Sequence, residues 1–302
     1  MLRAPFSYFG GKRHAAELVW RAIGDVAHFV EPFCGSAAVL LARPHAPHRE
    51  TINDADGMVA NFWRAVKAGP DVVADHADWP VNEADLHARH GWLIGHRDAL
   101  TERLIADPEW FDARAAGWWV WGTRAWIGSG WCGERAVRQL PDIDPTGRKA
   151  VEATPALLRE LAARLRNVDV ACGDWTRILS PSALRLDRVS STGLLLDPPY
   201  REGNMDYAAG GTGTPLSATV RAWCEEHGDN PRLRIVLCGL SGEHAALEAR
   251  GWRAVAWKAN GGYGNATGGA NASRERLWLS PHCVERPARQ RTIFDVIGGA
   301  RG

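Results

Sequence analysis

The sequence predicts a doubly wound α/β fold, in which helices cover both faces of a mainly parallel sheet. Short apolar runs alternate with helical segments along the chain, as in successive βαβ units. The run Leu194-Leu195-Leu196 has the uninterrupted apolar character of a strand that is buried on both faces. Two runs end in an acid, at Asp54 and Asp197, where the strands of such sheets present their ligand sites.

The composition is that of an ordinary globular protein, with 302 residues of which 45% are hydrophobic and 24% charged. This length accommodates one large α/β domain with an insertion. The net charge of +1 does not indicate a nucleic-acid binder, so any contact with DNA must come from a local patch. No apolar stretch approaches about 18 residues and no signal segment opens the sequence, so we expect a cytoplasmic protein without membrane contact.

The six cysteines are widely scattered, without a C-x-x-C pair or histidines at zinc-finger spacing. We therefore expect reduced thiols that fill core space, and no bound metal. None of them stands near Asp197 in the sequence, and we expect none beside it in the fold.

The first motif, F-S-Y-F-G-G-K-R, lies at residues 6–13, ahead of a predicted helix at 14–23. Its two glycines allow the backbone to approach a ligand closely, and Lys12 supplies a point charge for a carboxylate or phosphate. A plain N-terminal turn explains these residues equally well, so both interpretations are open.

Residues 28–41 are predicted to form a short strand, a tight turn of small residues and the start of a helix. This is the first βα unit of a doubly wound sheet, whose turn lies over a ligand. The fingerprint G-x-G-x-x-G is absent, which disfavours a nicotinamide-dependent dehydrogenase. A sulfonium nucleoside carries no pyrophosphate and does not need that full set of glycines.

The second predicted strand, residues 49–54, ends in an acid nineteen positions after Gly35. At about twenty residues' distance such an acid reaches the hydroxyl pair of a ribose. Asn53 and Asp54 are also suited to cap the predicted helix at 57–66, although Asp56 is available for that task. The two roles are compatible.

Residues 67–165 have a different pattern, mainly helical and rich in tryptophan, with helices predicted at 83–94, 97–105 and 153–165. Between them, residues 118–131 alternate tryptophan with glycine and arginine. Aromatic wedges together with Arg124 would suit unstacked bases and phosphates. Clustered tryptophans more often form the core of a small helical subdomain, and we favour that interpretation.

The second half of the chain continues the sheet. A predicted strand at 168–172 precedes Asp174 and Trp175, which either bracket a ligand or begin a helix capped by Asp174. A further strand is predicted at 234–239, then a helix at 243–250. Residues 252–258 and 275–279 alternate as a final antiparallel pair. Tyr263, in the loop between them, is a candidate for one face of a base pocket, although a plain loop tyrosine is favoured.

Asp197-Pro198-Pro199-Tyr200 closes the leucine run. The two prolines stop ladder pairing and hold the backbone extended, which leaves carbonyl acceptors free. A carboxylate, a fixed carbonyl and the flat ring of Tyr200 suit an exocyclic amine on a planar base. A simple strand end with a buried tyrosine is the alternative.

Taken in order, F-x-G-G-K, E-P-F-x-G, N-D, a long insert and D-P-P-Y resemble the Dam-type (D12 class) adenine-specific DNA methyltransferases. The likeness is closest to phage-like members, which have similar W-K-A-N-G-G-Y and S-P-H-C segments, here at 257–263 and 280–283. It covers most of the chain apart from the insert and about the last twenty residues. Ala37 departs from the pattern, because many members carry a second glycine there, and we expect this methyl group to be a mild change.

The resemblance implies a Rossmann-like methyltransferase sheet of about seven strands. Residues 1–66 and 166–302 would form the catalytic domain, and 67–165 an inserted target-recognition subdomain. The implied cofactor is S-adenosyl-L-methionine, held by Tyr8, Gly11, Lys12, Glu31, Phe33, Gly35, Asp54, Asp174 and Trp175. The implied catalytic residues are Asp197, Pro198, Pro199 and Tyr200, with Arg124 and Tyr263 as candidates for DNA contact.

The implied reaction is methyl transfer to N6 of an adenine flipped out of double-stranded DNA, as in restriction-modification systems, by a monomer without metal. Three alternatives are open. Cytosine N4 makes the same demands, although those enzymes more often have serine at the position of Asp197. RNA is not excluded as the substrate. A DNA-binding module that has lost catalysis is disfavoured by the intact Asp197–Tyr200 motif and Lys12.

Overall fold

The computed structural model describes residues 2–6, 12, 14–126, 131–132, 153–199, 216–257 and 274–284, and the structural statements below concern these residues. Four of the predicted site residues lie outside the described ranges: Tyr8, Gly11, Tyr200 and Tyr263.

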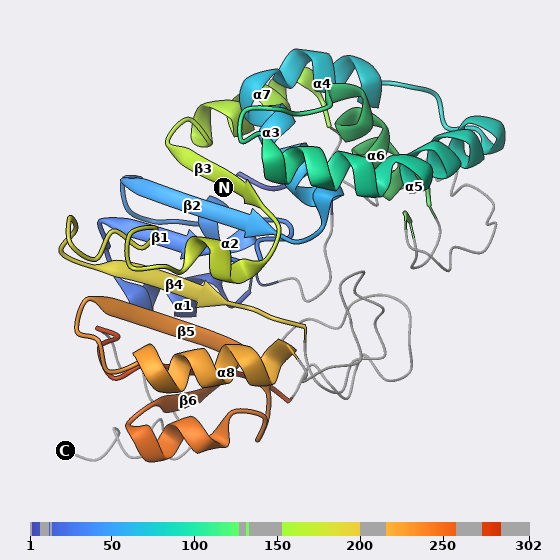
Figure 1. Cartoon of the computed structure of the whole chain (residues 1–302). Helices are drawn as coiled ribbons and strands as arrows, with labels where there is room; N and C mark the ends of the chain where they lie inside the picture. Colours follow the sequence, from blue (N-terminus) through green and yellow to red (C-terminus); the bar gives the residue numbers. More distant parts are fainter. Residues whose placement is uncertain are drawn as a thin grey trace, which may run out of the picture.

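A seven-stranded sheet organises the protein, in the order β3-β2-β1-β4-β5-β7-β6 (Figure 1). The strands are β1 (His28–Glu31), β2 (Arg49–Asp54), β3 (Val168–Cys172), β4 (Thr192–Leu196), β5 (Leu233–Leu240), β6 (Arg253–Ala256) and β7 (Glu275–Leu279). The first five are parallel to one another, whereas β7 runs antiparallel to both β5 and β6. The predicted doubly wound fold, its number of strands and its final antiparallel pair are confirmed.

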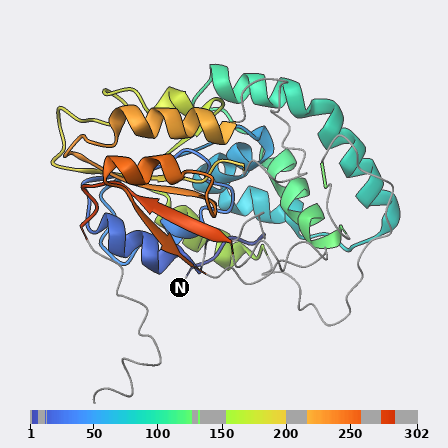
Figure 2. The same cartoon turned by 90° about the horizontal axis from the view of Figure 1, so that it is seen from below.

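Helices cover both faces of the sheet, which explains why its central strands are apolar throughout (Figure 2). Alternate residues of β4 serve the two faces: Leu195 packs in the core with α1 (Ala16–Ile23), and Leu196 packs in the core with α8 (Leu216–His227). The strand also carries Gly193, where a Cβ atom would lie 2.4 Å from Ile23. Glycine at this position lets α1 press directly on the sheet.

The chain reverses its direction of progress across the sheet between β1 and β4. From β1 it moves outward through β2 and β3, then returns to place β4 on the other side of β1. In open α/β sheets the crevice at such a switch point, beyond the carboxyl ends of the strands, is where ligands bind. Glu31, Asp54 and Asp197 all lie at this edge, because each ends or directly follows a parallel strand.

A group of helices gathers beside the β3 edge of the sheet (Figure 1). It consists of α3 (Gly57–Ala68), α4 (Pro70–Ala77), α5 (Glu83–Ala106), α6 (Ala113–Ala125) and α7 (Pro155–Arg164). The prediction of two helices at 83–94 and 97–105 is wrong, since α5 is continuous. Gly95 and His96 do not interrupt it, because a single glycine in a helix costs only about 1 kcal/mol and His96 stacks on Trp92 at 4.0 Å.

The tryptophans of this helical group form its core. Of the eight between residues 79 and 131, seven are buried or half-buried and only Trp79 is mostly exposed, at 53%. Trp119 packs edge-on against Phe6 with ring centroids 4.8 Å apart, and Trp121 donates a hydrogen bond to the Trp79 carbonyl. Much of the 118–131 stretch belongs to α6 rather than to an irregular aromatic wedge. The core interpretation is therefore the better one.

Side-chain caps fix the helix starts that the sequence indicated. Asp56 accepts a hydrogen bond from the Met58 amide at 2.9 Å and begins α3. Asp174 accepts one from the Thr176 amide at 2.9 Å and begins a 3-10 helix, η1 (Trp175–Ile178). The helix predicted at 243–250 is a shorter 3-10 helix, η2 (Ala245–Arg250), which ends at Gly251 in the left-handed region with φ 82°.

Candidate active site

Asp197 and Lys12 meet at the carboxyl edge of the sheet. The Lys12 ammonium lies 3.1 Å from Asp197 Oδ1 and 3.5 Å from Glu275 Oε2. The aromatic ring of Trp257 is 5.5 Å away, within reach of a cation–π interaction. Lys12 is buried and Asp197 is only 18% exposed. The fold therefore brings the beginning of the chain, the end of β4 and the start of β7 to one place.

Lys12 is held as a cation by this arrangement. Burial by itself lowers the pKa of the ammonium group, but Asp197, Cys238 and Glu275 together outweigh burial and raise the pKa of Lys12 above its ordinary value. Lys12, Asp197 and Glu275 together carry a formal charge of −1 when both carboxyl groups are ionised. The proposed role of Lys12 toward a cofactor carboxylate stays a prediction, since the described partners of its ammonium are protein carboxylates.

Cys238 lies beside Asp197, so the expectation that no cysteine would do so is wrong. Leu196, the residue before Asp197, pairs with Leu237 of β5, and this register brings the next residue of β5 beside Asp197. The Cys238 thiol forms a hydrogen bond with the Asp197 carboxylate. Burial, followed by repulsion from Asp197, raises the pKa of Cys238 well above its usual value. A buried neutral thiol is a donor and not a nucleophile, which agrees with direct transfer without a covalent intermediate.

The residues after Asp197 leave the sheet as predicted. Strand β4 ends at Leu196, and Pro198 is buried while Pro199 is half-buried. Among the hydrogen bonds of the described residues, none ends on the Pro198 carbonyl. Within the described residues, that oxygen therefore keeps its acceptor capacity next to Asp197.

Asp54 joins the end of β2 to the turn after β1. Its Oδ2 accepts a hydrogen bond from the Gly35 amide at 2.9 Å, and its Oδ1 accepts one from the Asp56 amide at 2.9 Å. Burial, followed by repulsion from Asp56, raises the pKa of Asp54 to about 7. Each carboxylate oxygen has a second lone pair, so the predicted ribose contact is compatible with this role and stays a prediction.

The turn after β1 requires two residues in the left-handed region. Gly35 has φ 45° and Ala37 has φ 48°. Glycine adopts this conformation freely, but for alanine it costs about 1–2 kcal/mol because Cβ crowds the following carbonyl. The replacement of glycine by alanine at 37 is therefore less mild than the sequence suggested. The Gly35 carbonyl in turn accepts a hydrogen bond from Trp63 Nε1 at 2.8 Å, which fixes the turn against α3.

Glu31 ends β1 with a buried carboxyl group. Its Oε2 atom has no hydrogen-bond partner among the described residues. Burial, followed by repulsion from Asp197, raises the pKa of Glu31 well above its ordinary value. A buried acceptor without a partner is costly, so this atom is suited to a donor supplied by a ligand.

The remaining predicted residues lie on two different elements. Phe33 is half-buried after β1, with its ring centroid 6.0 Å from that of Trp175 at the start of η1. Asp174 is exposed and occupied as a cap, as described above. Arg124 is half-buried in the last turn of α6, within the helical group.

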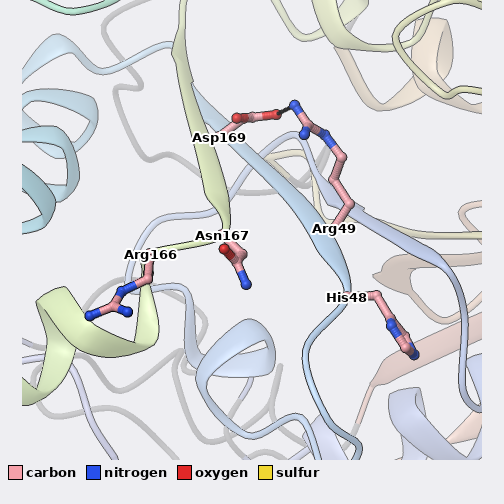
Figure 3. Close-up of a pocket in the computed structure, with 5 residues that line it drawn as sticks. All are labelled: His48, Arg49, Arg166, Asn167 and Asp169. Carbon is pink, nitrogen blue, oxygen red and sulfur yellow. Dashed lines mark hydrogen bonds and ion pairs between the residues drawn. The ribbon is translucent and has the colours of Figure 1, made fainter.

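A pocket of about 260 Å³ lies at the opposite edge of the sheet, at the amino ends of β2 and β3 (Figure 3). It is lined by His48, Arg49, Arg166, Asn167 and Asp169, and its Arg49 is paired with Asp169. None of the predicted site residues lines it. We assign it no part in the reaction, since the ligand crevice of such sheets is at the other edge.

Comparison with known families gives one finding that bears on the chemistry of this edge. Residues 8–91 match the family described as D12 class N6 adenine-specific DNA methyltransferase. Over this segment the chain is similar to adenine-specific DNA methyltransferases. The match includes Lys12, Glu31, Phe33, Gly35 and Asp54, and it supports transfer of a methyl group to adenine N6 in DNA. No curated protein matches the chain.

The part of the chain that the structure describes shows neither a membrane span nor a metal cluster. No described helix is long and apolar enough to cross a bilayer. No group of three or more histidine, cysteine, aspartate or glutamate side chains is placed there to hold a metal ion.

Proposed function

We propose that this methyltransferase moves a methyl group from S-adenosylmethionine to the exocyclic N6 of adenine in DNA, with Asp197 holding the amine. One observation carries the proposal. Lys12 belongs to the segment that matches the adenine methyltransferases, and its ammonium lies 3.1 Å from Asp197, which lies outside that segment. The ion pair thus supports one shared site for the D-P-P-Y motif at 197–200 and the matched segment at 8–91.

Asp197 and Pro198 are suited to activate a poor nucleophile. The lone pair of the adenine amine is delocalised into the ring, and two hydrogen bonds from the amine to the Asp197 carboxylate and the Pro198 carbonyl favour a pyramidal, electron-rich nitrogen. These bonds strengthen as positive charge develops on nitrogen during attack, so they stabilise the transition state more than the ground state. Positioning of the two reactants supplies much of the remaining acceleration.

The residues at this edge fit S-adenosylmethionine, which supplies an electrophilic methyl group when bound. The Oε2 atom of Glu31, which has no hydrogen-bond partner among the described residues, suits a cationic amine, and the turn at Gly35 lets the backbone approach a nucleoside. Asp54, which anchors the Gly35 turn, is the proposed contact of the ribose, and the aromatic pair of Phe33 and Trp175 is the proposed face for the adenine. Tyr8, Gly11, Lys12 and Asp174 complete the proposed set by resemblance.

The target adenine must leave the duplex stack before it reaches Asp197, at a cost of a few kcal/mol. Tyr200 follows the prolines, and stacking of the flipped base on its ring would return about 1–3 kcal/mol. Tyr263 is a proposed second face of the same pocket.

Residues 67–165 are the proposed target-recognition subdomain, and residues 1–66 and 166–302 the proposed catalytic domain. Within the proposed recognition subdomain, Arg124, half-buried in α6, is the proposed contact with DNA. We further propose that the enzyme is a monomer of the phage-like subgroup that acts in restriction-modification.

The test is incubation with methyl-labelled S-adenosylmethionine and unmethylated double-stranded DNA, followed by digestion and identification of the labelled nucleoside. We expect label in N6-methyldeoxyadenosine. Label in N4-methyldeoxycytidine would mean that Asp197 serves a cytosine amine, and label in RNA alone would mean that the substrate class is wrong. Binding of DNA without any transfer would indicate a module that has lost catalysis.

A further inference from the structure

Glu275 is a buried acid at the proposed site that the reaction scheme leaves without a role. It is the first residue of β7 and pairs with Leu240, the last residue of β5. Because β7 runs antiparallel to β5, its first residue lies at the carboxyl edge of the parallel strands. Its side chain is only 10% exposed, with Oε2 3.5 Å from the Lys12 ammonium.

Lys12 is therefore shared between two carboxylates. Its ammonium has Asp197 Oδ1 at 3.1 Å and Glu275 Oε2 at 3.5 Å. Two further titratable groups interact with Asp197: Cys238, whose thiol is neutral and hydrogen-bonds Asp197, and Glu31, whose pKa is raised by burial and then by Asp197. Without Glu275, the lysine would lose one of its two described carboxylate contacts and would interact more strongly with Asp197, the carboxylate that the adenine amine needs.

Stability alone is a weak explanation for this cluster. Desolvation of buried charges offsets most of their attraction, so apolar residues of similar volume usually serve a fold equally well. Such groups are common at functional sites, where charge and orientation are the properties required. The antiparallel β7 delivers this particular charge to the end of β4, on which Asp197 stands.

We propose that Glu275 is a positioning residue for methyl transfer and acts through Lys12. Because its carboxylate also interacts with the Lys12 ammonium, Glu275 weakens the hold of Lys12 on Asp197 and keeps the Asp197 carboxylate available to the amine. It also keeps the net charge of Lys12, Asp197 and Glu275 at −1. A net negative cluster favours the positive charge that develops on the amine nitrogen during attack. This inference rests on the proposed function, since it assumes that Asp197 holds the amine.

The test compares Glu275→Gln, which removes the charge and keeps the shape, with Glu275→Asp, which keeps the charge. We expect Glu275→Gln to lower kcat roughly 10-fold or more, with KM for DNA and Kd for S-adenosylhomocysteine changed less than about 3-fold. Glu275→Asp should recover part of the lost kcat. Glu248→Gln, the same change at an exposed position in η2, is the matched control and should leave kcat unchanged.

Lys12→Met tests the route. If Glu275 acts through Lys12, the double variant Lys12→Met with Glu275→Gln should have the same kcat as Lys12→Met alone. A double variant whose loss of kcat is the product of the two single losses would contradict an action through Lys12. Unchanged kcat in Glu275→Gln would overturn the inference, as would loss of S-adenosylhomocysteine binding. These results differ from failure of the proposed function, in which the wild-type enzyme itself transfers no methyl group to DNA and both proposals fall.

Discussion

The ammonium of Lys12 lies 3.1 Å from the Asp197 carboxylate, although the two residues stand in different thirds of the chain. Lys12 precedes the first strand of the sheet and Asp197 follows the fourth. The pairing depends on the reversal between β1 and β4, which brings both chain segments to one crevice. It also places Lys12 beside the proposed amine-binding residue Asp197, and not at the proposed cofactor site alone.

Replacement of Lys12 distinguishes these two roles. If Lys12 acts mainly by orienting the Asp197 carboxylate, the Lys12→Met variant leaves that carboxylate without the cation that holds it. Its kcat should then fall about 100-fold, while the Kd for S-adenosylhomocysteine changes less than about 3-fold. Calorimetric titration with S-adenosylhomocysteine, together with single-turnover transfer, separates the two quantities. Loss of binding with normal transfer at saturation would instead place Lys12 on the methionine carboxylate.

Lys12→Met also leaves two carboxylates buried without their cation, which costs about 3–5 kcal/mol of stability. Lys12→Arg keeps the charge and is the control for folding. It should retain most of the melting temperature while altering kcat, because its planar head group cannot reproduce both contacts of the ammonium.

Asp54 should make stability depend on pH. Its pKa rises from 3.8 to about 7 in the folded state, so its contribution to stability is complete below pH 3.8 and is lost as the pH rises through about 7. That difference in pKa corresponds to at most about 4 kcal/mol. Urea unfolding at several pH values measures this effect. Between pH 3.8 and about 7, the free energy of unfolding should fall less for Asp54→Asn than for the wild type. Parallel curves for the two proteins would contradict the raised pKa.

Glu31 should show a conflict between stability and binding. Its pKa is raised by burial and by Asp197, so the ionised form destabilises the fold at neutral pH. Glu31→Gln removes that charge, and its melting temperature at pH 8 should be equal to or above that of the wild type. Its affinity for S-adenosylhomocysteine should fall roughly 10-fold, since a neutral amide attracts a cationic amine less. A variant that binds normally would remove Glu31 from the cofactor site.

The group of helices beside β3 offers a matched pair of glycines. At Gly117 of α6 a Cβ atom would lie 2.4 Å from His76 Cβ and 2.7 Å from the Val73 carbonyl of α4, whereas at Gly91 of α5 nothing lies within 4 Å. Gly117→Ala should destabilise the protein by about 1–3 kcal/mol through overpacking. Gly91→Ala should stabilise it by about 0.5–1 kcal/mol through helix propensity. Equal melting temperatures for the two variants would contradict the packing of α4 on α6.

Local sequence patterns were sufficient to predict much of the fold. Apolar runs and the acids that end them predicted the strands, and single side chains such as Asp56 predicted where helices begin, because capping depends on residues only two or three positions apart. The exception is α5, where Gly95 looked like a break but meets open space and is tolerated. Similarly, the conformation of Ala37 follows from how the turn packs and not from its own side chain.

The site was predictable only in part. Asp197, Glu31 and Asp54 stand at strand ends, where the sequence itself marks them. Cys238 and Glu275 were missed because their proximity to Asp197 depends on the register of β5 and β7, which connects residues far apart in the chain. One signal for Glu275 was available in the sequence: it is an acid, and it is the first residue of the predicted antiparallel strand at 275–279.

The most direct test of the account is replacement of Asp197 with readouts for both chemistry and binding. Asp197→Ala should form no measurable N6-methyldeoxyadenosine in DNA while its Kd for S-adenosylhomocysteine stays within about 3-fold of the wild type. Asp187→Asn, at an exposed position, is the control and should methylate normally. Normal methylation by Asp197→Ala would contradict the central claim, and parallel loss of cofactor binding would make Asp197 a structural or cofactor-binding residue.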